Sequence, residues 1–224
     1  MNQSNGEQQQ QGVGGAQAQF ARAASQGCAR HPHLQKLIDS SGPDAGRDFA
    51  DAVHLLCALH GHYPGLIGLA LERCPDGDPG EWLAIAAEAF ERERLYLVRL
   101  APAVGPIPST PGAAQTESSL LAARHALETL AASERSGCAL GAATALIVDW
   151  WGVRLLLDRA AARVGIEPPS MALPDEQSVS DMIDSVAQSP TAARALAFGS
   201  EQLLLQHRAL MDLLEARAEA RGDY

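Results

Sequence analysis

Aromatic residues are scarce in this 224-residue chain. Phe, Trp and Tyr make up only 4% of it, whereas hydrophobic residues as a group reach 46%, and much of that share is alanine. Small apolar residues favour closely approaching helices, because sheets are enriched in Val, Ile and Tyr. No segment has the alternating pattern of a half-buried strand. We therefore predict an all-α fold.

The chain also lacks the features of a membrane or secreted protein. Its apolar, uncharged stretch 136–148 is shorter than the roughly 20 residues of a spanning helix, and Asp149 ends it. Residues 1–20 are rich in Gln and Gly, without the basic and apolar segments of a signal peptide. We predict a disordered tail over 1–20, no membrane contact and a cytoplasmic location.

Basic residues are outnumbered and do not cluster. Seventeen Lys and Arg stand against twenty-seven Asp and Glu, so the formal net charge is −10 at pH 7. Nucleic acids and anionic membranes are bound by concentrated positive charge. We therefore expect neither as a partner, and a transcription factor is a poor fit because no predicted helix is basic enough to read DNA.

Cysteine and catalytic motifs are sparse as well. Cys28, Cys57, Cys74 and Cys138 show no C-x-x-C pair and no regular spacing, which favours free thiols and implies neither a disulfide framework nor a zinc site. A phosphate-binding loop, a dinucleotide fingerprint, a kinase motif set and a nucleophile elbow are all missing. No residue is therefore assigned a catalytic or cofactor-binding role, and the cofactor stays unknown.

What the chain does contain is a series of helices. Start and stop signals predict helices over 46–72 with a kink at Gly61 and Pro64, 78–100, 116–135, 138–164, 178–188 and 190–217. Segment 102–115, rich in Pro, Gly and Ser, is long enough to cross the end of a bundle. Gly137, Gly141 and Ala145 have the spacing of a close helix contact. Residues 21–224 are predicted to form a single helical bundle domain.

Five of these helices each place one ionisable side chain on the apolar face. The five residues are His60, Glu93, Glu134, Asp149 and His207. Carboxylate oxygens and imidazole nitrogens on facing helices suit iron or manganese, so the five form a candidate metal site. The alternative is that they pair with one another, or with Arg92, Arg124, Arg135 or Arg154, as buried contacts that fix helix register.

Two predicted hairpins joined by a long crossover resemble the ferritin-like di-iron fold over residues 48–164, with additional C-terminal helices. That family carries a Glu on each of two helices and Glu-x-x-His on each of the other two. This chain has no Glu-x-x-His, and His125-x-x-Glu128 reverses the order. The resemblance therefore implies a degenerate metal-binding protein or oxidase.

The stretch 90–151, with FERERLYLVRLAP, RHALETLAASERSGCALGAA and DWW, resembles an uncharacterised Ala/Arg-rich helical protein family of high-GC bacteria. Such a family implies no activity. From the missing motifs and the Ala/Gly-rich faces we predict a non-catalytic protein that associates with itself or with another protein as a scaffold. The alternatives are the metalloprotein and a small-molecule-binding bundle with a cavity near Trp82, Tyr96 and Trp150.

Overall fold

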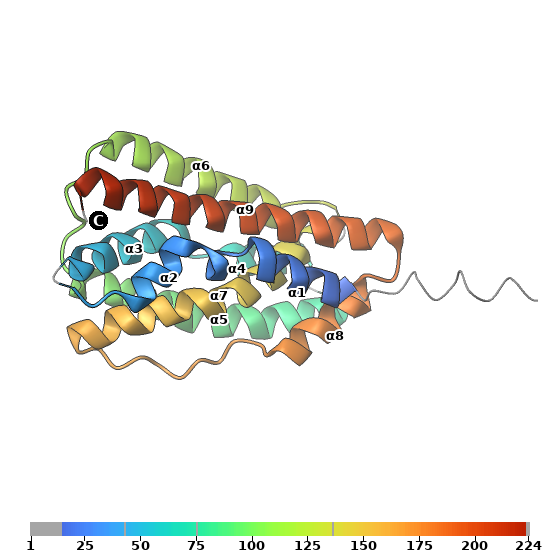
Figure 1. The fold of residues 1–224 in the computed structure, drawn as a ribbon. Helices are drawn as coiled ribbons and strands as arrows, with labels where there is room; N and C mark the ends of the chain where they lie inside the picture. The colour runs from blue at the N-terminus through green and yellow to red at the C-terminus, as the bar shows by residue number, and fades with distance from the viewer. Residues whose placement is uncertain (1–14, 43, 75, 136, 223–224) are drawn as a thin grey trace, which may run out of the picture.

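The computed structural model describes residues 15–222 of the chain, apart from 43, 75 and 136. No β-strand occurs among these residues, so the all-α prediction is confirmed (Figure 1). In chain order the helices are α1 (Gly15–Gln26), the 3-10 turn η1 (Cys28–Arg30), α2 (Pro32–Asp39), α3 (Ala45–His60), α4 (Leu66–Arg73), α5 (Gly77–Ala103), α6 (Ala113–Ala131), α7 (Cys138–Val164), α8 (Glu176–Val186) and α9 (Pro190–Arg221).

Helix α7 is the centre of the bundle. It packs most extensively on α9, and also on α3, α4, α5 and α6. The N-terminal segment 15–39, formed by α1, η1 and α2 and called here the N-terminal strap, packs lengthwise on α7 and α9 (Figure 1). By length and composition α7 could span a membrane, but 78% of its apolar window is buried inside the protein. Its apolar composition is therefore that of a core helix, which is compatible with a soluble protein.

Two glycines set the distance between α7 and α9. A β-carbon on Gly141 would lie 2.1 Å from the carbonyl oxygen of Leu196, and one on Gly199 would lie 2.0 Å from the carbonyl oxygen of Cys138. Any larger residue at either position would push the two backbones apart. The predicted close contact at Gly141 is thus confirmed, and Gly199 is its counterpart on α9.

The predicted helix 46–72 is two helices instead of one kinked helix. Helix α3 ends at His60 and α4 begins at Leu66. Pro64 has no backbone N–H to donate, and it also disfavours the helical conformation of Tyr63 before it. Tyr63, predicted to continue the apolar stripe, is 77% exposed as a result.

The predicted N-terminal tail is too long. Helix α1 begins at Gly15, so residues 15–20 are helical, while the rest of the predicted tail lies outside the described residues. Ala16, Gln19 and Ala23 recur at helical spacing and form the buried face of α1. Gln19 also donates to Thr144 Oγ1 of α7 at 2.6 Å. The Gln/Gly-rich composition of this segment gave no indication of the short buried face of α1.

The predicted crossover is present over 104–112, between the end of α5 and the start of α6. Helix α6 packs on α3, α4, α7 and α9. The crossover therefore carries the chain away from α5 to the opposite side of the bundle, where it borders α3.

We expect Gly199→Ala to lower the free energy of unfolding by about 1–3 kcal/mol, the usual cost of overpacking a core. The added carbon would lie against the backbone of α7 and force the two helices apart. Urea denaturation followed by circular dichroism measures the loss. Gly42→Ala is the control, because a β-carbon there meets nothing within 4 Å. Equal stability of the two variants would contradict the close contact.

Candidate functional site

Three of the five predicted metal ligands form one buried hydrogen-bonded chain. His60 Nε2 lies 2.9 Å from His207 Nε2, and His207 Nδ1 lies 2.7 Å from Asp149 Oδ2. All three residues are at most 5% exposed. They come from the end of α3, from α9 and from α7, so the helical pattern placed each of them correctly on an inner face.

The chain holds a carboxylate in the core. Burial, and then the neighbouring His207, lower the pKa of His60 well below its ordinary value, so this imidazole is neutral. Burial raises the pKa of Asp149, but the hydrogen bond and the charge of His207, together with the adjacent thiol and backbone N–H of Cys28, outweigh it and leave the pKa below its usual value. Because a carboxylate only accepts, His207 Nδ1 donates to Asp149.

The other carboxylate oxygen of Asp149, Oδ1, has no hydrogen-bond partner among the described residues. A β-carbon on Gly27 would lie 2.3 Å from it, so a glycine at this position leaves the oxygen its room. Cys28 follows directly, and its Sγ is 4.0 Å from the carbonyl oxygen of Asp149. Burial, and then the charge of Asp149, raise the pKa of the Cys28 thiol well above its ordinary value.

Glu93, the fourth predicted ligand, is buried but already paired. Arg154 Nη1 donates to its Oε1 at 2.6 Å, and Trp150 Nε1 donates to its Oε2 at 3.1 Å. Burial raises the pKa of Glu93, and the charge of Arg154 opposes that rise. Since both carboxylate oxygens are occupied and a guanidinium is adjacent, Glu93 fits the alternative of a buried polar contact.

Glu134 lies apart from these residues, and the prediction that it faces the interior is wrong. Helix α6 ends at Ala131, and Glu134 is exposed in the bend before α7. The predicted helix continued to residue 135, so the helical period was extended to Glu134, beyond the actual end of α6. With Glu93 paired and Glu134 exposed, these residues do not fit a ferritin-like di-iron centre.

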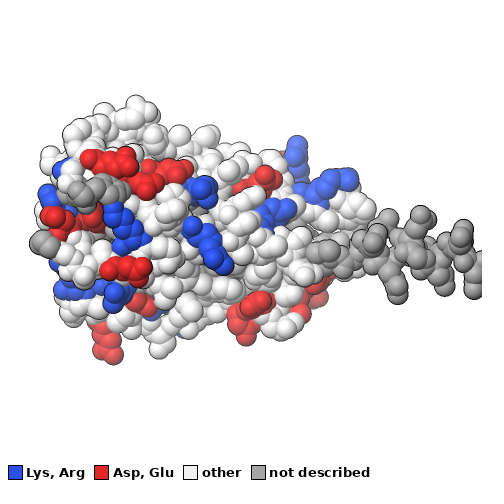
Figure 2. All heavy atoms as spheres, in the orientation of Figure 1, with Lys and Arg blue, Asp and Glu red and all other residues white. Residues whose placement is uncertain are grey.

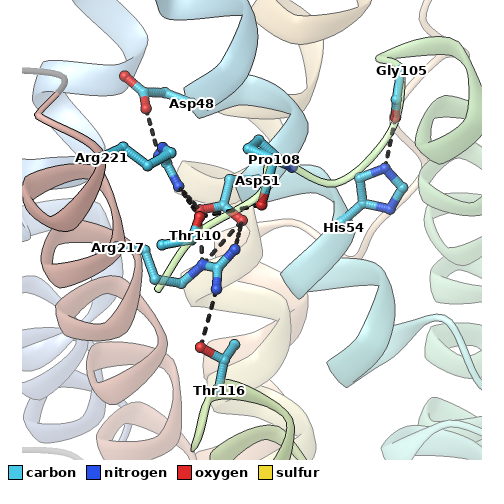
Figure 3. Close-up of polar contacts among 9 residues, drawn as sticks. All are labelled: Asp48, Asp51, His54, Gly105, Pro108, Thr110, Thr116, Arg217 and Arg221. Carbon is cyan, nitrogen blue, oxygen red and sulfur yellow. Dashed lines mark hydrogen bonds and ion pairs between the residues drawn. The ribbon is translucent and has the colours of Figure 1, made fainter. Parts of the chain in front are cut away.

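A groove of about 730 Å³ lies between α3, α6 and the crossover 104–112. Its walls are mainly apolar and include Leu55, Ala58, Ile107, Leu120 and Leu121. Small-molecule sites have volumes of roughly 300–1,000 Å³. His54 Nε2, 2.8 Å from the carbonyl oxygen of Gly105, holds the first part of the crossover in place (Figure 3).

A buried ion-pair network fixes the other end of the crossover (Figure 3). Arg217 of α9 binds Asp51 of α3 through both Nη2 and Nε, at 2.7 and 2.9 Å. Its Nη1 donates to Thr116 Oγ1 at 3.1 Å. Arg221 also pairs with Asp51, at 2.5 Å, and donates to Thr110 Oγ1 of the crossover at 3.1 Å. The network therefore ties α3, α6 and α9 to the segment that borders the groove.

His62 and Arg124 stand where the groove meets two further hollows. Arg124 Nη1 is 2.7 Å from His62 Nε2. Both residues line the groove, a cavity of about 30 Å³ that His60 also lines, and an outer hollow of about 480 Å³. The small cavity has room for a water molecule. One small cavity thus separates the buried chain from the groove.

The aromatic residues predicted to line a cavity do not line this groove. Trp82, Tyr96 and Trp150 are at most 7% exposed and belong to the apolar core. Trp82 Nε1 donates to Ser178 at 3.0 Å, and the Tyr96 hydroxyl donates to Asp158 at 3.0 Å. Each polar group has a partner, so the three rings serve as core packing.

The chain belongs to a family of unknown function, DUF6975, whose model matches residues 23–222. The matched residues include the buried chain, the ion-pair network and the groove described in this subsection. No curated protein and no solved structure matched the chain. The prediction of an uncharacterised family is confirmed, and the family supplies no activity, so a function has to be argued from the site itself.

We expect Arg154→Met to destabilise the fold by about 3–5 kcal/mol, because it leaves the Glu93 carboxylate buried without its cation. The double variant Arg154→Met/Glu93→Gln should recover most of this loss, since Gln keeps an oxygen for the Trp150 N–H. Urea denaturation measures both variants. Arg92→Met, at an exposed pair with Glu88, is the control. A double variant no more stable than Arg154→Met would contradict the pairing.

Proposed function

We propose that this protein is a non-catalytic binding protein whose ligand site is the groove between α3, α6 and the crossover 104–112. The observation that carries the proposal is the groove itself, about 730 Å³ with mainly apolar walls and a few polar groups. Concave apolar sites with a small number of polar groups are typical of small-molecule binding. Its borders are held by buried hydrogen bonds, so little ordering is needed on binding.

The charge at the groove favours an organic anion with an apolar body. Arg124 and His62 lie at its rim, and Glu117 is the acidic residue of its lining, whereas Arg217 in its wall is already paired with Asp51. Arg124 pairs with Glu128 at 3.6 Å, but its side chain is 34% exposed, so its guanidinium can be reached from solvent. A guanidinium binds a carboxylate or sulfonate through charge-assisted hydrogen bonds. The ligand's apolar body would lie against Ile107 and Leu121, which are 51% and 53% exposed.

Surface charge and the cysteines support a soluble protein of the cytoplasm with no nucleic-acid or membrane partner. Figure 2 shows Lys and Arg interspersed with Asp and Glu on the face that carries the N-terminal strap, without a basic patch on that face. The four cysteines are free thiols, as a reducing compartment requires.

We expect the full-length protein to bind 1-anilinonaphthalene-8-sulfonate, an apolar-bodied anion that fluoresces in apolar sites, saturably and at one site. Leu121→Glu should abolish the binding by placing a charge against the ligand body. Arg124→Gln should weaken it about tenfold by removing a charged hydrogen-bond donor. Fluorescence titration measures both effects.

Two matched controls accompany this titration. Leu155→Glu introduces the same charge at a residue of α7 that is 57% exposed, and Arg92→Gln removes an exposed arginine of α5. Neither residue lines the groove, so both variants should bind as the wild-type protein does. Unchanged binding by Leu121→Glu, or an equal loss in Leu155→Glu, would overturn the groove as the ligand site.

A second candidate function is association with a second copy of the chain through α5. Ile85, Leu95 and Val98 are large apolar residues of this helix and are 65%, 52% and 39% exposed. Glu88 and Arg92, paired at 2.6 Å, lie among them on the exposed side. In a two-fold arrangement, Glu88 of each copy would face Arg92 of the other, so this surface is complementary to itself.

For this candidate we expect light scattering to give the mass of a dimer at micromolar concentration. Leu95→Glu should convert the dimer to a monomer, because it buries a charge at the centre of the contact. Leu155→Glu again serves as the control and should stay dimeric. A wild-type protein that is monomeric throughout the accessible concentration range would exclude the α5 contact.

A further inference from the structure

We propose a zinc site that joins the N-terminal strap to the bundle, with Cys28 of η1, Asp149 of α7 and His207 of α9 as its protein ligands. Each residue offers one ligand atom within 4.8 Å of the other two. The three residues are only 0–2% exposed. Thiolate, imidazole and carboxylate are the ligands of protein zinc sites. The site does not depend on the groove and stands apart from the function proposed for it.

An independent observation points to a cation at this place. Asp149 Oδ1 is buried and has no hydrogen-bond partner among the described residues. Burying a carboxylate oxygen without a hydrogen-bond partner costs free energy, and such groups in native proteins often mark the place of a water or an ion. Gly27 lets this oxygen approach the N-terminal strap closely, because a β-carbon there would lie 2.3 Å from it. A divalent cation would satisfy the oxygen and balance the buried charge.

The distances suit tetrahedral coordination after a small adjustment. Zinc bonds of about 2.3 Å to sulfur and about 2.0–2.2 Å to nitrogen and oxygen place ligand atoms roughly 3.3–3.8 Å apart. Ligand atoms that already lie within 4.8 Å of one another reach this spacing by a shift of about 1 Å. Zinc would replace the hydrogen bond between His207 and Asp149. The fourth coordination position of the zinc would be filled by the second Asp149 oxygen or by a water.

The protons can be followed through binding. The Cys28 thiol loses its proton to solvent as the sulfur–zinc bond forms. His207 binds through Nδ1, so its ring hydrogen moves to Nε2. His60 Nε2, 2.9 Å away, then accepts a hydrogen bond from it, with the ring hydrogen of His60 on Nδ1, as the outer partner of a metal-bound imidazole usually does. In this assignment His60 is a positioning residue that fixes the His207 ring without touching the metal.

Zinc at this site would fasten the strap. The strap lies along α7 and α9 (Figure 1), and zinc would join its Cys28 to one residue of each of these helices. A ligand that binds only the folded state stabilises that state. Zinc should therefore slow proteolysis within residues 15–39, a readout that does not involve any activity or the groove.

The experiment uses full-length protein prepared without a histidine tag, stripped with a chelator and titrated with zinc chloride in a calorimeter. Cobalt(II) titration followed by absorption reports thiolate ligation. Two background changes remove other metal-binding groups. Cys57→Ser/Cys74→Ser removes the partly exposed thiols, and Asp212→Asn disrupts the group His31, Asp212 and Glu215. We expect one equivalent of zinc and a thiolate-to-cobalt charge-transfer band.

The variants separate the site from a structural effect. Cys28→Ser should weaken zinc binding about 100-fold and remove the cobalt band, whereas His60→Gln should weaken binding about tenfold. Cys138→Ser is the matched control, because Cys138 is also buried, at 1% exposed, and lies outside the cluster. It should bind zinc as the background protein does.

Three results would overturn the proposal. The first is binding of less than about a tenth of an equivalent of zinc by the background protein. The second is equal zinc affinity in Cys28→Ser and Cys138→Ser. The third is zinc binding by the background protein without a thiolate–cobalt band. Because this test keeps Cys28 in place, it decides for or against the site even if Cys28→Ser does not fold. Loss of dye binding in the groove would leave each of these results unchanged.

Discussion

The polar core depends on the close approach of α7 and α9. These helices run in parallel (Figure 1) and meet where Gly141 and Gly199 let one backbone touch the other. Asp149 and His207 each follow the glycine of their own helix by roughly two turns, so the same approach brings them to 2.7 Å. A helix pair held apart by alanine would leave a carboxylate and an imidazole facing each other across a gap in the core.

The buried carboxylates differ in how completely they are paired. Asp51 is bound by two guanidinium groups, those of Arg217 and Arg221. Both oxygens of Glu93 accept hydrogen bonds, one of them from Arg154. Asp149 has an imidazole on one oxygen and no hydrogen-bond partner on the other. The first two carboxylates are fully paired, so Asp149 is the one with an oxygen left for the ligand proposed above.

The sequence predicts inner-face residues well within helices, including His60 as the last residue of α3, and fails beyond a helix end. Glu93, Asp149 and His207 sit within α5, α7 and α9, where the helical period holds for several turns on either side. Glu134 lies beyond the end of α6, where that period no longer applies. No sequence pattern indicates the role proposed for Cys28, because its partners come from α7 and α9 and only tertiary packing brings them together. The groove could not be predicted from the sequence either, since it depends on how the crossover packs beside α3.

The hydrogen bonds of His60 connect the proposed zinc site to the cavity beside the groove. Asp149 accepts from His207 Nδ1, and His207 Nε2 lies 2.9 Å from His60 Nε2. With zinc on Nδ1, His207 would donate from Nε2, and His60 would accept with its own hydrogen on Nδ1. His60 borders the small cavity beside His62 and Arg124, at the rim of the groove. Zinc bound between Cys28, Asp149 and His207 would thus fix which nitrogen of His60 carries the hydrogen, at the edge of the cavity next to the groove.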